Sequence, residues 1–186
     1  ASCRRSLFSS EELRSAYLRT LLTATSDIIN NKRHLLGDKV CYTHFCRLLV
    51  AMKANNQLAD LAKLDQYSDW IRALAAFTVT SFENWEWAGT STHYLVTLWA
   101  RLTLSIPYMR GELPTYLDSL VPQVTQAYID TRLKAVAEAV KDDDLATFFE
   151  ESSIQEHVHF MPTLCRHVYA STFQFLCSRV HPLRQQ

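Results

Sequence analysis

Residues 9–31 read SSEELRSAYLRTLLTATSDIINN, and this stretch decides the fold class. A serine followed by Glu12 forms a capping box: the serine side chain accepts a backbone N–H of the first turn, and Glu12 reaches back. Apolar residues then recur every three or four positions, which predicts a helix of about twenty residues. They are Leu13, Tyr17, Leu18, Leu21, Leu22, Ile28 and Ile29. The polar run 30–33 ends this helix.

The same period continues through the rest of the chain. Further long helices are expected to begin near residues 39, 68, 91, 122 and 163, with a short helical stretch at 57–64. Asp38 and Ser68 stand where a helix cap is needed, and Pro122 and Pro162 suit a first helical turn. The predicted inward residues are Cys41, Phe45, Leu48, Leu49, Met52, Ile71, Leu74, Ala75, Thr78, Phe82, Trp85, Tyr94, Leu95, Leu98, Trp99, Leu102, Ile106, Val124, Tyr128, Leu133 and Val136.

Glycine is scarce, and its placement supports an all-α chain of helices and joints. The three glycines, Gly37, Gly89 and Gly111, stand at breaks between helical patterns. Alternate long helices recur at a spacing near that of HEAT and armadillo repeats, which predicts an α-solenoid of HEAT-type helix pairs. The expected divisions are 1–31 as the end of one repeat, 39–85 and 91–140 as the next two, 141–153 as an acidic loop, and 154–180 as the start of another. A closed six-helix bundle is the alternative architecture.

Composition and motifs point to binding rather than catalysis. The formal net charge is +0, which argues against nucleic acid or an anionic membrane as the main partner. The Gly-rich loops and nucleophile elbow of common enzyme classes are missing, so no catalytic residue or cofactor is predicted. Cys41, His44 and Cys46 offer metal-ligand types, but on a helix Cys46 points away from His44, so no metal site is predicted. The five cysteines are expected to be buried free thiols.

Two further groups of residues have both a structural and a functional interpretation. Trp70, Trp85 and Trp99 fit core positions at helical spacing, with a ligand cage as the alternative, and Trp87 is the one expected to be partly exposed. The acidic run Asp142, Asp143, Asp144, Glu150 and Glu151 fits either helix capping or an interaction loop.

Several ordered runs resemble one family over nearly the whole chain. They are 4–8 (RRSLF), 45–49 (FCRLL), 77–82 (FTVTSF) with Trp85, 93–95 (HYL) with Leu98 and Trp99, and 124–129 (VTQAYI) with Arg132 and Leu133. This series is similar to the exportin seven / Ran-binding protein sixteen branch of the importin-beta superfamily. The match resembles an interior stretch of such a receptor.

The resemblance implies a right-handed, armadillo-like superhelix that binds protein cargo, the Ran GTPase with GTP and nuclear pore proteins, and shuttles between nucleus and cytoplasm. By the family's layout, the helices near 10, 68 and 122 would line the concave surface, and those near 39, 91 and 163 would be outer. Polar residues expected in that concavity are Arg14, Arg72, Gln123, Gln126, Asp130 and Lys134, and the acidic run would contact Ran or a basic cargo face. The alternatives are a helical-repeat scaffold independent of Ran and a small helical-bundle enzyme.

Overall fold

The computed structural model describes residues 7–84, 87, 89–109 and 115–141. Its elements are α1 (Glu11–Asn31), η2 (Arg33–Leu36), α2 (Lys39–Asn55), α3 (Leu58–Ala62), α4 (Tyr67–Glu83), α5 (Gly89–Thr103), η3 (Ile106–Tyr108) and α6 (Leu117–Lys141). Every regular element in these residues is helical, which confirms the predicted all-α class. None of the helices described has the length and apolarity that crossing a membrane requires.

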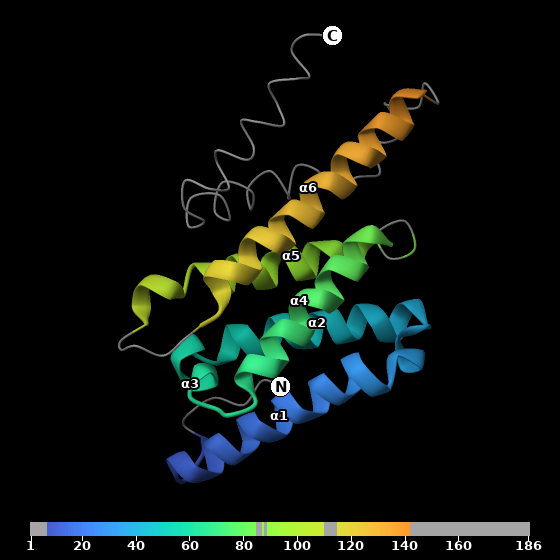
Figure 1. Ribbon diagram of the computed structural model, residues 1–186. Coiled ribbons are helices and arrows are strands. Elements are labelled where there is room, and N and C mark those ends of the chain that lie inside the picture. The colour runs from blue at the N-terminus through green and yellow to red at the C-terminus, as the bar shows by residue number, and fades with distance from the viewer. Residues whose placement is uncertain (1–6, 85–86, 88, 110–114, 142–186) are drawn as a thin grey trace.

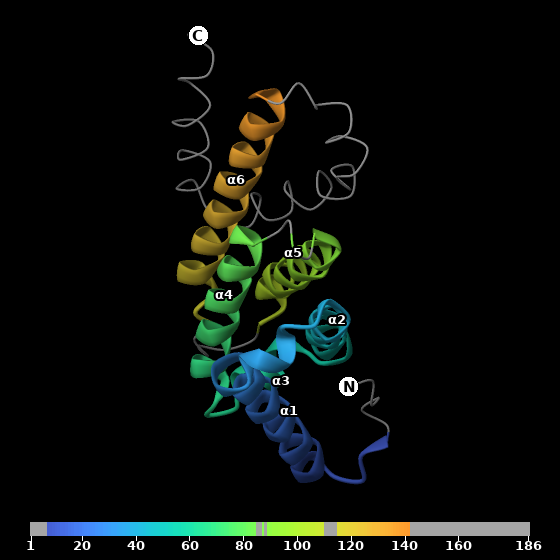
Figure 2. The same cartoon turned by 90° about the vertical axis from the view of Figure 1, so that its right-hand side faces the viewer.

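The long helices form an open stack of two layers. Helix α4 packs against α1 on one side and α6 on the other, while α2 packs against α5. Figure 2 shows α2 and α5 side by side in one layer and α1, α4 and α6 in the other. Helices α1 and α6 lie at opposite ends of the stack (Figure 1), so the described residues form an extended helical array and not a closed bundle.

The core is apolar, and two buried tryptophan side chains form hydrogen bonds that join helices within it. Trp70 on α4 is 1% exposed and its indole N–H donates to the Thr25 hydroxyl on α1 at 2.9 Å. Trp99 on α5 is fully buried and donates to the Thr78 hydroxyl on α4 at 3.0 Å. Each bond satisfies a buried indole donor, so both rings are fixed core residues, as the helical spacing predicted.

The predicted N-caps of α1 and α2 are both found. Of the two serines at 9 and 10, the second is the N-cap of α1. Ser10 is the N-cap of α1 and its hydroxyl accepts from the Leu13 amide at 3.3 Å. Asp38 caps α2 and accepts from the Cys41 amide at 2.8 Å. The helix expected to start near residue 68 begins one residue earlier, at Tyr67, and its N-cap position is Gln66 and not Ser68. Tyr67 is 1% exposed, so its burial extends the helix past the local signal.

The predicted start at Pro122 is also wrong, because α6 begins five residues earlier and holds Pro122 inside it. Leu117 and Val121 are buried in the core, and covering them favours an additional helical turn before the proline. The ring of Pro122 leaves one carbonyl of that turn without its usual helical donor. Tertiary burial therefore overrides the position that local sequence preference gives to proline.

Several predicted inward residues are more exposed than the periodicity implied. Leu13 is 56% exposed and Leu133 is 46% exposed. Cys41 is an exposed free thiol, which contradicts its predicted burial, whereas Cys46 is a buried free thiol as predicted. Helical spacing gives the face on which a residue lies, but a neighbouring helix must reach that part of the face to bury it. Cys3, Cys165, Cys177, Trp85 and the predicted helix after Pro162 lie outside the described residues.

Candidate functional site

A groove along α6, bordered on one side by the end of α4, contains four of the six polar residues that were predicted to line the concave surface: Gln123, Gln126, Asp130 and Lys134. Its volume is about 560 Å³. The groove, called the α6 groove below, is lined by Glu83, Gln123, Gln126, Ala127, Asp130, Thr131, Lys134, Ala135 and Glu138. All but Glu83 come from α6 (Figure 1).

Helical periodicity explains why these residues share one face. The α6 residues are spaced by three or four positions, which places them in a stripe along the helix. On the neighbouring face, Val121, Val124 and Tyr128 are buried, and Tyr128 packs edge-on against Phe82 of α4 with ring centroids 5.4 Å apart. This packing fixes the rotation of α6 and leaves the polar stripe facing outward.

The α6 groove is acidic. Glu83, Asp130 and Glu138 contribute three carboxylates against the single amine of Lys134. Lys134 lies 4.0 Å from Glu138 one turn later, and their side chains are 77% and 49% exposed. Exposed pairs of this kind contribute little to stability. The carboxylates are therefore available to a cationic partner.

Gln126 stands at the edge between this groove and the core. Its amide nitrogen is buried and forms no hydrogen bond among the described residues. Leaving a buried donor unpaired has a free-energy cost.

Two other predicted groove residues lie elsewhere. Arg72 is on α4, one and a half turns past its start and about 16 Å from Glu83 along the helix axis. Its guanidinium lies over the Tyr116 ring, 4.9 Å from the centroid, and 3.8 Å from the Asp69 carboxylate. Arg72 is exposed but belongs to a separate surface.

Arg14 is buried and does not line the α6 groove, which corrects the prediction for this residue. It is 5% exposed and bonds to Asp60 at 2.6 Å and Glu11 at 2.9 Å. The Asp60 carboxylate raises the pKa of Arg14 above its ordinary value. Because Asp60 lies at the third position of α3, this ion pair ties α1 to α3 and is part of the structure.

The acidic residues Asp142, Asp143, Asp144, Glu150 and Glu151 lie outside the described residues. Helix α6 is described through Lys141, the residue directly before Asp142 in the sequence. The proposed contact role of this run stays a prediction.

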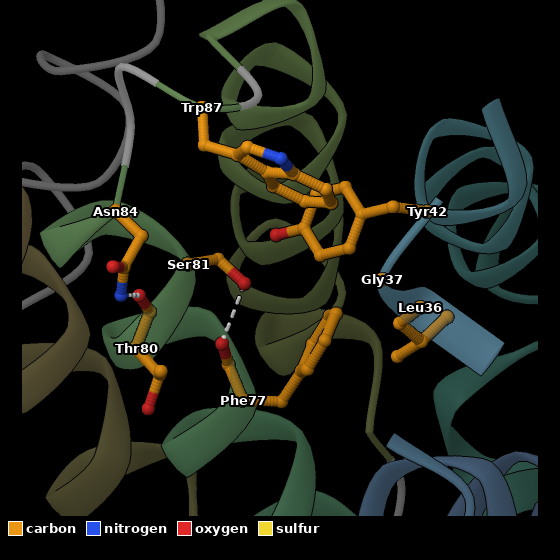
Figure 3. Close-up of a pocket in the computed structure, with 8 residues that line it drawn as sticks. All are labelled: Leu36, Gly37, Tyr42, Phe77, Thr80, Ser81, Asn84 and Trp87. Carbon is orange, nitrogen blue, oxygen red and sulfur yellow. Dashed lines mark hydrogen bonds between the residues drawn. The ribbon is translucent and has the colours of Figure 1, made fainter. Parts of the chain in front are cut away.

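An aromatic pocket lies on another part of the surface, between η2, α2 and the end of α4 (Figure 3). Its volume is about 420 Å³, and Trp87 packs edge-on against Tyr42 with centroids 5.1 Å apart. Phe77 forms the floor, 5.7 Å from Tyr42, and the Ser81 hydroxyl donates to its carbonyl at 2.7 Å. Trp87 is 43% exposed, which confirms its predicted exposure. Trp87 contacts Tyr42 in this pocket, whereas Trp70 and Trp99 are buried in the core and do not line it.

Sequence reasoning missed Glu83 and Glu138 as members of the α6 groove. Glu138 continues the spacing of Asp130 and Lys134, so the same helical wheel contains the signal for it. Glu83 comes from α4, and no local pattern indicates that the end of α4 borders α6.

The described residues hold no group of three His, Cys, Asp or Glu side chains arranged to bind a metal ion. An open helical array with an acidic groove and an aromatic pocket is typical of proteins that bind other proteins. Such a surface offers charge and shape complementarity to a partner. The described residues therefore have the architecture of a helical-repeat fragment.

Comparison with known proteins identifies the branch. Ran-binding protein 17 of Homo sapiens is 42% identical over 157 residues, which make up 81% of this chain and 14% of that protein. Exportin-7-A of Xenopus laevis is 38% identical over 176 residues, 95% of this chain and 16% of that protein. Ran-binding protein 16 of Drosophila melanogaster is 36% identical over 175 residues. No family model and no solved structure matches the chain.

The chain belongs with the exportin-7 / Ran-binding protein 16 and 17 branch, which confirms the predicted resemblance. It spans 14% to 16% of the length of these three relatives.

Proposed function

We propose that this chain is a segment of a nuclear transport receptor that binds protein cargo and Ran-GTP and carries proteins through the nuclear pore. Two relatives with 38% and 36% identity are named for export and for Ran binding. In this proposal the receptor also contacts nuclear pore proteins, shuttles between nucleus and cytoplasm, and acts by binding without catalysis.

The observation that supports a contact role for this segment is the acidic α6 groove. Three carboxylates and one amine line this groove. The residues that follow the end of α6 in the sequence are Asp142, Asp143 and Asp144. We propose that these acids, with Glu150 and Glu151, attract a basic face of Ran or cargo, and that Gln126, Asp130 and Lys134 contact it. Arg72 would contact a partner only if the partner also covers the first half of α4.

The test is charge reversal in the full-length receptor, with Ran-GTP and cargo affinity measured across ionic strength. Asp130→Lys combined with Glu138→Lys, and separately reversal of Asp142, Asp143 and Asp144, should weaken binding and flatten its salt dependence. Exposed charges act mainly on association rate, so the loss is expected in the on-rate. Asp65→Lys is the matched control, because Asp65 is exposed and lies outside the groove.

The competing proposal is a helical-repeat scaffold that does not depend on Ran. In that case the reversals would leave Ran-GTP affinity and its salt slope unchanged, and adding Ran-GTP would not alter the binding of other partners.

A further inference from the structure

A second groove lies at the other side of the stack, where the end of α2 and α3 meet η3 (left in Figure 1). Its volume is about 870 Å³. This groove, called the Lys53 groove, is lined by Lys53, Ala54, Asn55, Asn56, Gln57, Leu58, Ala59, Lys63, Ser105, Pro107, Tyr108 and Met109. Among these lining residues there are two lysines and no carboxylate.

Lys53 is the unusual member of the groove. It is 8% exposed, yet it forms no ion pair with any described carboxylate. Its amine has a single long hydrogen bond, 3.5 Å to the backbone carbonyl of Asn56. Burying an ammonium group without a counter-charge is costly, and proteins usually avoid it by pairing.

The surroundings increase that cost. Burial lowers the pKa of Lys53, and the nearby Arg101 guanidinium lowers it further. Lys63 adds a second, exposed amine to the same groove. The region therefore has an uncompensated positive charge, which an anion would neutralise.

The shape and lining indicate what kind of anion fits. Leu58, Pro107 and Met109 give the groove apolar walls beside the amine, and Tyr108 on its rim is 83% exposed. A bare inorganic ion would use only the amine, whereas an extended peptide would also cover these carbon atoms. Nucleic acid is disfavoured, because it rewards a long basic surface and this chain has a formal net charge of +0.

We propose that the Lys53 groove binds an acidic segment of a partner protein, with one carboxylate of that segment beside the Lys53 amine. This contact is separate from the α6 groove, which carries the opposite charge and suits a basic partner. It does not depend on the proposed transport function, and its test uses neither Ran nor cargo.

The probe is a fluorescein-labelled peptide of alternating leucine and glutamate, with a leucine–glutamine peptide of equal length as the uncharged control. Binding to the full-length protein is measured by fluorescence anisotropy. Lys53→Met should reduce affinity at least tenfold, Lys63→Met about twofold to threefold, and Lys53→Arg should retain most of the affinity, since a charge paired at a buried site is worth far more than an exposed one. Lys39→Met is the control, because Lys39 is an exposed lysine that lines neither groove, and this variant should have no effect.

A measurement on the unsubstituted protein guards against folding defects in the variants. Reductive methylation with isotope-labelled formaldehyde makes the Lys53 amine visible by NMR, and its titration is followed with and without the peptide. Bound carboxylate should raise the Lys53 pKa. The proposal is overturned if the two peptides bind equally, if Lys53→Met binds like the unsubstituted protein, or if the peptide leaves the Lys53 titration unmoved.

Discussion

Two basic side chains are buried in the described part of the molecule, and their surroundings are opposite. Arg14, at the junction of α1 and α3, is 5% exposed and bonds to two carboxylates. Lys53, in the groove between α2, α3 and η3, is 8% exposed and bonds to a backbone carbonyl only. Their pKa values move in opposite directions, up for Arg14 and down for Lys53.

The difference separates a structural charge from a candidate binding charge. The cost of burying Arg14 is compensated within the chain, so this cation stabilises one arrangement of α1 against α3. The cost of burying Lys53 is not compensated by any described carboxylate. A group that is maintained at a cost to folding is a good candidate for a site that a partner completes.

The largest expected effect is the loss of the counter-ion of Arg14. Asp60→Asn leaves the buried guanidinium with only the half-exposed Glu11, and breaking a buried pair in this way should lower the free energy of unfolding by about 3 kcal/mol. Equilibrium urea unfolding measures it. Asp69→Asn is the control: its partner Arg72 is 58% exposed, and the change should stay below about 1 kcal/mol. Equal effects at both positions would contradict the structural role of the Arg14–Asp60 pair.

The second prediction is that replacing the two buried cations by methionine changes the free energy of unfolding in opposite directions. Lys53→Met removes an unpaired charge and keeps the length of the side chain, so it should raise the free energy of unfolding by about 1 kcal/mol. Arg14→Met should lower it, because it strands the Asp60 carboxylate. The same urea titration compares the two variants. A destabilised Lys53→Met protein would show that Lys53 already has a compensating partner.

The third prediction concerns pH. The folded-state pKa of Lys53 is below its unfolded value, so the unfolded chain binds more protons between the two values. Below the folded-state pKa, Lys53 is charged in both states and its burial penalty is present in full. As pH rises toward the ordinary lysine pKa the amine becomes neutral and the penalty disappears. The stability gain of Lys53→Met over the unsubstituted protein should therefore be largest below the folded-state pKa of Lys53 and shrink steadily as pH rises toward the ordinary lysine pKa. If the stability gain of Lys53→Met did not change with pH, it would come from packing of the methionine side chain and not from removal of the charge.

The smallest effect is expected for the exposed lysine of the α6 groove. Lys134 is 77% exposed and only 4.0 Å from Glu138, so Lys134→Met should change the free energy of unfolding by less than about 0.5 kcal/mol. High salt should reduce even this difference. Thermal unfolding at low and high ionic strength measures it, and a large effect would mean that the α6 groove is a structural ion-pair network.

The sequence by itself determined the local features of this protein. The all-α class, a serine cap at 9–10, the cap at Asp38, and the buried Trp70 and Trp99 followed from periodicity and cap residues, and the ordered runs indicated the family. The stripe of Gln126, Asp130 and Lys134 was also predictable, because residues of one helix that differ by three or four positions share a face.

Only the tertiary structure decided which of these faces is covered and which charges meet. Arg14 and Asp60 are 46 positions apart, and the Trp70–Thr25 bond joins residues 45 positions apart. Glu83 borders the α6 groove from another helix, and Pro122 lies inside α6 because Leu117 and Val121 are buried. No feature of the sequence around Lys53 indicates that this lysine is buried. Its burial without a described counter-ion occurs at a groove that residues of α2, α3 and η3 line together. Helical periodicity within α2 contains no information about η3, which is distant in the sequence.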